Sequence, residues 1–411
     1  MEEIVNESEE NVTTKLKDPI EELVRAGAQK MLQIALEEEI TAFIESHKDM
    51  KSADGHRMVV RNGYHRERTI QTTSGSIQIK QPRIDDRKLK KDERFKSCIL
   101  PKFMRKSPTL EGAIPILYLK GLSGNKFTSA LKEIFGEDAK GFSPSTITRL
   151  KKSWIKEFEK WKKRSLEGKE YVYVWADGVY CNSRLDDNKL CLLVIIGVRP
   201  DGVKELLAVQ DGVRESEESW SEVLRDLQNR GLTKAPKLAV CDGALGFQKA
   251  VDKIWGPMKI QRCWFHKMGN VLDKLPKSMQ TKATEKMRNI FLAETKEKAE
   301  EAYREFIRTF ELKYPKAVEC LTKDHEDLFR FYDYPAEHWV HIRTSNPIES
   351  TFATVRLRHK TTKGNGTSEA TKGMAFKLCK EAEKNWKKIK GFEKLQLVLD
   401  DKIFKDGILA A

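Results

Sequence analysis

The chain has 411 residues and a formal net charge of +14, with 76 lysines and arginines against 62 aspartates and glutamates. This length allows two or three domains and excludes a small disulfide-stapled scaffold. The charge favours a polyanionic partner such as nucleic acid over a neutral or cationic one. Seven cysteines without a Cys-x-x-Cys pair argue against a disulfide framework. No secretory signal and no apolar run of about 20 residues is found, so we expect a cytoplasmic protein without membrane contact.

The N-terminal part predicts a helical region followed by a basic β-hairpin. Apolar residues at helical spacing over residues 18–44 indicate an amphipathic helix, with Gly27 as a candidate break, and we assign residues 1–57 to this region. The period-two pattern of RERTIQTTSGSIQIK, with a turn at Ser74-Gly75-Ser76, predicts a hairpin within residues 58–90. Its basic residues suit DNA phosphates, although a charged edge that prevents aggregation would look the same. These residues are Arg61, Arg66, Arg68, Lys80 and Arg83.

Residues 105–165 predict three helices in the layout of a helix-turn-helix DNA-binding domain. One helix ends near LYLKGLS, a second ends at Gly136, and a basic third helix opens at Ser143-Pro144. In a helix-turn-helix the last of these helices enters the major groove. A three-helix packing unit with a charged outer face would give the same pattern. The residues expected to face DNA are Ser145, Thr146, Thr148, Arg149, Lys151 and Lys152.

From residue 171 the pattern changes to strands that alternate with helices. Strands are predicted over residues 171–177, 189–197, 204–210, 236–241 and 258–262, with helices over 219–230 and 247–254. Three meandering strands followed by helix, strand, helix and strand match the mixed sheet of a ribonuclease H-like α/β core. We therefore expect this core over residues 170–265, an all-helical insertion over 266–340, a second part of the core over 341–395 and a tail over 396–411.

Two of these strands end on an aspartate followed by glycine, in VWADG at Asp177 and in AVCDG at Asp242. Gly178 is expected to turn the chain so that Asp177 faces a crevice at the strand ends. Two neighbouring carboxylates repel each other, and a divalent cation such as Mg²⁺ neutralises them. Each Asp-Gly pair is also an ordinary turn sequence. Glu349, on the first turn of a helix that opens at Asn346-Pro347, is the candidate third acid, although it also suits the helix dipole.

A cysteine and three histidines offer a different metal site. Cys263 and His266 are three residues apart, as are His338 and His341, which are plausible spacings for zinc ligands. A buried cysteine beside a packed histidine is the alternative. Trp264, between the first pair, is expected to fill the core, although it would also stack on a flipped base.

Seven short motifs follow one another along the chain, namely RNGYHRERTI, LYLKGLS, SPSTITRL, WADG, CDG, RCWFH and NPIES. As a set they resemble the mutator-type bacterial insertion-sequence transposases, a branch of the DDE transposases. The resemblance implies that Asp177, Asp242 and Glu349 are the catalytic acids and that they hold two Mg²⁺ ions, for which Mn²⁺ substitutes. It also implies that Cys263 and His266 support this site, and we add the neighbouring Asn346 to them.

The activity implied by the resemblance is DNA transposition. Such an enzyme binds the terminal inverted repeats of its element, hydrolyses a phosphodiester bond at each end and joins the freed 3′-hydroxyl to target DNA. Because two ends must meet, we expect a homodimer on double-stranded DNA, associated with the nucleoid. Basic residues that follow the glutamate on its helix and in the next loop are expected to hold phosphates. They are Arg356, Arg358, His359, Lys360 and Lys363.

Two other functions remain open from the sequence, a metal-dependent nuclease that cuts branched DNA without joining it and a non-catalytic DNA-binding regulator. A tyrosine recombinase is disfavoured. His65 and Arg68 match its His-x-x-Arg pattern, but the next tyrosine, Tyr118, lies in an apolar helix.

Overall fold

The computed structural model describes residues 19–119, 144–181, 190–243, 245–362 and 367–410. The chain divides into two compact units, Met1–Thr148 and Arg149–Ala411. Within the described ranges, none of the helices combines the length and the apolar character needed to cross a membrane.

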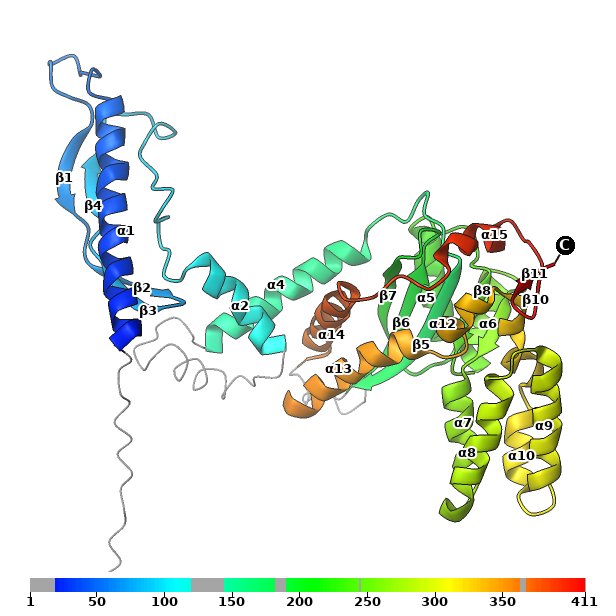
Figure 1. Cartoon of the computed structure of the whole chain (residues 1–411). Coiled ribbons are helices and arrows are strands. Elements are labelled where there is room, and N and C mark those ends of the chain that lie inside the picture. Colours follow the sequence, from blue (N-terminus) through cyan, green and yellow to red (C-terminus); the bar gives the residue numbers. More distant parts are fainter. Residues whose placement is uncertain (1–18, 120–143, 182–189, 244, 363–366, 411) are drawn as a thin grey trace, which may run out of the picture. The chain divides into compact units, whose positions relative to one another are not determined.

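The first unit is built on one long helix and two short antiparallel strand pairs. Helix α1 (Pro19–Ser46) runs through Gly27 without a break and lies along the strands (Figure 1). Strands β2 (Arg68–Thr72) and β3 (Gly75–Ile79) form the predicted hairpin, with Gly75 at a φ of 103° that favours glycine. β1 (Val60–Tyr64) pairs with β4 (Pro82–Asp85). Helix and hairpin share a small apolar core of Leu36, Ile70, Ile77, Ile79 and Leu100.

Two of the three helices predicted for the DNA-binding region fall in the described residues. They are α2 (Pro108–Leu119) and α4 (Pro144–Lys162), and α4 begins at the predicted proline. The second predicted helix lies outside the described residues, so the helix-turn-helix stays a prediction. Far along α4, Phe158 and Trp161 contact Phe376 of α14 (Ser368–Glu383).

The second unit contains a five-stranded mixed sheet in the order β7-β6-β5-β8-β9. Strands β5 (Tyr173–Cys181), β6 (Leu190–Val198) and β7 (Lys204–Gly212) form the predicted antiparallel meander. Strands β8 (Leu238–Cys241) and β9 (Lys259–Arg262) are parallel to β5. β5 is thus the central strand, and its nearly uninterrupted apolar sequence suits burial on both faces.

The prediction that β5 ends at Asp177 was wrong. Asp177 pairs with Val194 of β6, and the antiparallel pairing continues to Cys181, so Gly178 lies inside the strand and does not turn the chain. On its other side β5 pairs with β8 only as far as Ala176, opposite Cys241. Asp177 therefore lies at the end of the parallel pairing while the strand itself continues. The second Asp-Gly pair does follow a strand end, and Gly243 there has a φ of 84°.

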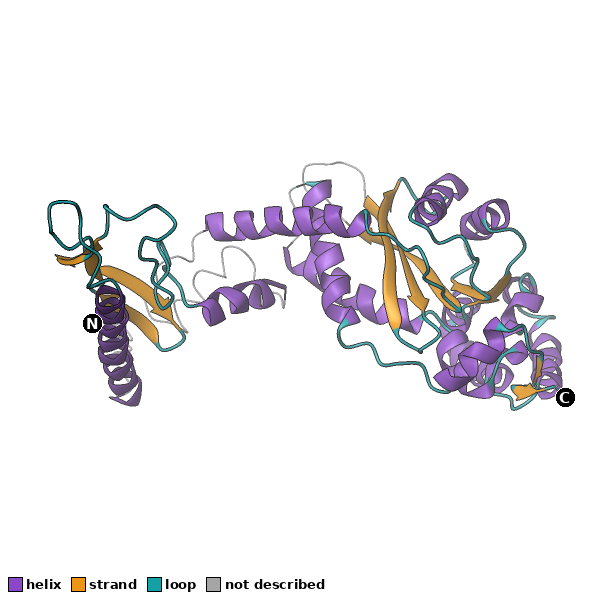
Figure 2. Cartoon of the chain, turned by 90° about the horizontal axis from the view of Figure 1, so that it is seen from above, coloured by secondary structure: helices purple, strands orange, loops and turns teal. Residues whose placement is uncertain are grey.

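Helices cover both faces of this sheet (Figure 2). Alternate residues of β5 point to opposite faces. Val174 and Ala176 join the large core beneath α5 (Glu217–Asn229) and α6 (Leu245–Ile254). On the other face, the hydroxyl of Tyr173 forms a hydrogen bond with His338 Nδ1 at 2.8 Å, and Trp175 Nε1 donates to the carbonyl of His341 at 3.1 Å. Helix α13 (Asn346–Thr362) contacts β5 and β6, and α14 contacts β7.

The expected insertion is helical. Residues 264–342, which the structure describes without a gap, contain helices and turns but no strand, and the long helices run side by side away from the sheet (Figure 1). The last residues form α15 (Leu395–Leu399) and a small hairpin of β10 (Phe404–Lys405) and β11 (Ile408–Leu409). The α-helices of the insertion are α7 (Trp264–Leu272), α8 (Lys277–Phe291), α9 (Lys296–Phe310), α10 (Pro315–Thr322), α11 (His325–Leu328) and α12 (Trp339–Ile342).

Candidate active site

The register of two parallel strands brings Asp177 and Asp242 together. Ala176 of β5 is the register partner of Cys241 of β8, and each aspartate is the next residue along its chain. Carboxylate oxygens of Asp177, Asp242 and a third residue, Glu215, all lie within 4.8 Å of one another. Glu215 lies in the loop between β7 and α5. Three acids are therefore gathered where the parallel pairing of the central strand with β8 ends.

Burial changes the proton affinity of this acidic group. Asp177 is 7% exposed, and burial together with the negative charge of Asp242 raises its pKa to about 7. Burial and the charges of Asp242 and Asp177 likewise raise the pKa of Glu215 to about 7. The backbone N–H of Gly178 donates to Asp177 Oδ1 at 2.8 Å, and this hydrogen bond partly offsets the rise in the pKa of Asp177. A donor set made only of carboxylate oxygens fits a hard divalent cation such as Mg²⁺ or Mn²⁺.

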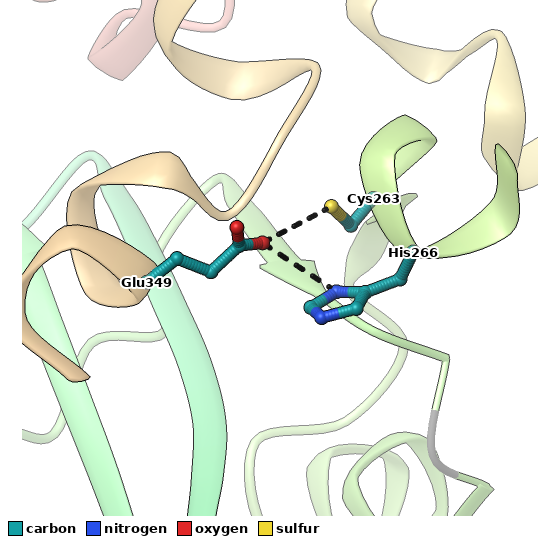
Figure 3. Close-up of side chains that lie close together, drawn as sticks. All are labelled: Cys263, His266 and Glu349. Atoms are coloured by element: carbon teal, nitrogen blue, oxygen red, sulfur yellow. Dashed lines mark hydrogen bonds and ion pairs between the residues drawn. The ribbon is translucent and has the colours of Figure 1, made fainter. Parts of the chain in front are cut away.

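Glu349 lies on the first turn of α13, as the Asn346-Pro347 sequence predicts. Its carboxylate Oε1 accepts a hydrogen bond from Ser345 Oγ at 2.6 Å. The same oxygen lies 3.7 Å from His266 Nδ1 and 4.0 Å from Cys263 Sγ (Figure 3). Ser345 is fully buried, and its backbone N–H also donates to Cys263 Sγ at 3.3 Å. A cysteine, a histidine and a serine thus fix the position of the third predicted acid.

Cys263 and His266 form a coupled pair at the start of α7. The hydrogen bond with Cys263, opposed by burial, raises the pKa of His266 to about 9. Burial alone would raise the pKa of the Cys263 thiol, but its hydrogen bonds with His266 and Ser345 outweigh burial and lower it. The charges of Asp177 and Glu349 also raise the pKa of His266. His266 is therefore close enough to interact electrostatically with acids from both β5 and α13, which links Asp177 and Glu349 through one imidazole.

The alternative zinc site is not assembled. Both ring nitrogens of His338 have other partners, Tyr173 Oη and the carbonyl of Gly391, each at 2.8 Å. His341 Nε2 accepts from the backbone N–H of Lys390 at 2.9 Å. Cys263 and His266 instead cluster with Glu349. Trp264 is fully buried and donates to the carbonyl of Leu328 at 2.8 Å, so it fills the core as expected.

Two of the predicted DNA contacts in the first unit bond to other protein groups. Arg61 pairs with Glu37 of α1 at 2.6 Å. Arg68 donates to Gln81 Oε1 at 2.9 Å and is half-buried. Arg66 is exposed. The residues expected to face DNA from the third helix lie on the first turns of α4, and they are exposed except for the half-buried Thr146 and Lys151. The exposed ones are Ser145, Thr148, Arg149 and Lys152.

The predicted contacts on α13 differ in exposure. Arg356 and Lys360 are exposed, while Arg358 is only 1% exposed and lies in the interior. Arg358 therefore does not present its guanidinium to a phosphate in this conformation. The helical positions explain the difference, because residues two apart on a helix point in different directions. Asn346 is exposed at the start of α13. The side chain of His359, and Lys363 as a whole, lie outside the described residues.

Sequence reasoning missed two residues of this site, Glu215 and Ser345. Glu215 follows a predicted strand at an irregular spacing, and the two glutamates that follow it in RESEES look like ordinary acids at a helix N-terminus. Ser345 directly precedes the NPIES motif that drew attention to Glu349. A serine just before a helix-start signal is a recognisable capping residue, so this signal was present.

The structure defines an α/β protein with a mixed sheet and clustered acids beside its central strand, and comparisons with known proteins give the family. The model described as "Transposase, Mutator family" matches residues 1–389. The chain belongs to this family of transposases.

Its relatives include transposases of bacterial insertion sequences. The chain is 51% identical over 296 residues to the transposase for insertion sequence element IS6120 of Mycolicibacterium smegmatis, covering 72% of this chain and 91% of the relative. It is 46% identical over 288 residues to the transposase for element IST2 of Acidithiobacillus ferrooxidans, covering 68% and 95%. The transposase for IS256 in transposon Tn4001 of Staphylococcus aureus is 27% identical over 330 residues, covering 79% and 81%.

Proposed function

We propose that this protein is a DDE transposase that cuts DNA at the ends of its insertion sequence and joins those ends to target DNA. The observation that carries the proposal is the meeting of Asp177 and Asp242 at the end of the parallel β5–β8 pairing, with His266 interacting electrostatically with both Asp177 and Glu349. The strand order β7-β6-β5-β8-β9, with helices on both faces, supports a ribonuclease H-like catalytic core.

Each acid has a role that follows from its position. Asp177 and Asp242 would hold divalent cations from adjacent strands, and Glu349 would complete the set from α13. Mg²⁺, or Mn²⁺ in its place, would supply an activated nucleophile when bound and would neutralise charge on the phosphate. His266 holds Glu349 by charge, and Ser345 holds it by a hydrogen bond of 2.6 Å. No covalent protein intermediate is needed, because water and then a 3′-hydroxyl act as nucleophiles.

DNA binding follows from charge and position. Arg356 and Lys360 are exposed on the helix that carries Glu349, where they would hold phosphates next to the acids. The exposed first turns of α4 suit the major groove if residues 105–165 form a helix-turn-helix. The protein would act as a homodimer that brings two inverted repeats together on the nucleoid. The chain's net charge of +14 supports this attraction to DNA.

The test is incubation of the purified protein with labelled element-end DNA in the presence of Mg²⁺, Mn²⁺ or EDTA. The proposal predicts both cleaved ends and strand-joined products with either metal, and neither product with EDTA. Cleavage without joining would indicate a nuclease. DNA binding with neither reaction under any metal condition would indicate a regulator. Either of these results would contradict the proposal.

A further inference from the structure

Glu215 is a fourth acid at this site, and it comes from a part of the fold that the three predicted acids do not use. It belongs to the loop between β7 and α5, yet its carboxylate lies within 4.8 Å of both Asp177 and Asp242. Asp177 and Gly178 are neighbours on β5, so they face opposite sides of the sheet. Glu215 therefore reaches the aspartates across the position of Gly178, from the side that α5 and α6 cover.

Two glycines make this approach possible. A Cβ atom on Gly178 would lie 2.6 Å from the Glu215 carboxylate, so only a residue without a side chain leaves room for it. A Cβ atom on Gly246, in the first turn of α6, would lie 2.5 Å from the backbone oxygen of Glu215. The side chain and the backbone of Glu215 are thus each seated against a glycine. This close fit is independent of the charges in the cluster.

We propose that Glu215 is a metal ligand of the active site, which binds a divalent cation together with Asp177 and Asp242. This inference rests on the proposed function. Three ionised carboxylates this close repel one another, and either protonation or a cation among them relieves the repulsion. Glu349, in contrast, is held by Ser345, Cys263 and His266. The chain thus offers an all-carboxylate set on one side and Glu349 on the other, which suits two ions that each have a different group of ligands.

The first test measures metal binding without DNA, by titration of Mn²⁺ into the full-length protein in a calorimeter. Glu215→Gln keeps the shape of the side chain and removes its charge. Loss of this ligand should weaken Mn²⁺ binding at least about 10- to 100-fold, because that range is already seen when an outer group that only orients a ligand is removed. Cleavage of element-end DNA should slow by a similar factor. Glu218→Gln is the matched control, because Glu218 is exposed on the same helix start and should leave both measurements within about twofold.

Gly178→Ala tests the same idea through packing. The new methyl group would collide with the end of a flexible side chain, so Glu215 would move away while the strand remains. Gly178→Ala should therefore reproduce the weaker Mn²⁺ binding. In a Glu215→Gln background it should weaken Mn²⁺ binding by a further factor of less than about two, because residues that act through one contact are not additive. Circular dichroism melting would confirm that each variant is folded.

Asp177→Asn separates failure of this inference from failure of the proposed function. If Asp177→Asn weakens Mn²⁺ binding and Glu215→Gln does not, Glu215 is not a ligand and the three-acid site stands. If neither substitution changes Mn²⁺ binding, both the role of Glu215 and the metal site itself are wrong. Weaker binding in both variants, with Glu218→Gln unchanged, supports the inference.

Discussion

Removal of the charge of Asp177 should stabilise the metal-free protein, and the gain should grow with pH. The folded pKa of Asp177 is raised from 3.8 to about 7. Between these values the folded state binds a proton that the unfolded state has released, so wild-type stability falls as pH rises through this window. A shift of about three units corresponds to at most about 4 kcal/mol above pH 7. The Asp177→Asn variant carries an uncharged amide at this position at every pH and would escape this loss.

The assay is urea unfolding of wild type and Asp177→Asn in EDTA at pH 5, 6.5 and 8. The free energy of unfolding of the variant should exceed that of wild type by a margin that increases from pH 5 to pH 8, up to about 4 kcal/mol. Asp252→Asn, on the exposed side of α6, is the control and should change little at any of these pH values. A stability difference that is flat, or that shrinks as pH rises, would refute the account of Asp177 as a buried acid repelled by Asp242.

Three further substitutions test other parts of the account. Ser345→Ala removes the 2.6 Å hydrogen bond to Glu349 and should slow element-end cleavage at least tenfold in a single-turnover assay, whereas an unchanged rate would show that Ser345 does not position the acid. Trp264→Ala empties a buried site and should cost about 3–5 kcal/mol in urea unfolding; a loss under about 1 kcal/mol would contradict its core role. Arg356→Ala should lower the slope of the logarithm of the DNA-binding constant against the logarithm of salt concentration by about 1, the loss of one phosphate contact, when binding is measured on filters. An unchanged slope would exclude this contact.

The succession of the core strands along the chain was predictable from the sequence, as were the ends of β8 and β9, but the end of β5 was not. Runs such as KLCLLVIIG are long, apolar and β-branched, which defines a buried strand regardless of its partners. The end of β5 depends on those partners. Asp-Gly reads locally as a turn, but pairing with β6 carries the strand four residues past Asp177. That pairing is a tertiary contact, which no local pattern contains.

Part of the candidate site was predictable because some of its residues stand beside local sequence signals. Asp177 was noticed through an Asp-Gly turn signal, although its strand continues past it. Asp242 and Glu349 stand beside a strand end and a helix start, so their positions follow from local sequence. Glu215 does not, because its approach depends on the absence of a side chain at Gly178, which is distant in the chain. The burial of Arg358 was equally hidden, because a basic run on one helix does not show which of its members faces the core.

The most direct test of the central claim compares binding and chemistry in Asp177→Asn. A metal-coordinating acid contributes several kcal/mol to the transition state, which at about 1.4 kcal/mol per tenfold gives about a thousandfold in rate. With labelled element-end DNA and Mg²⁺, the account predicts that cleavage and joining both fall by about this factor, while affinity for the DNA changes less than about threefold. Retained cleavage, or an equal loss of binding and cleavage, would contradict it.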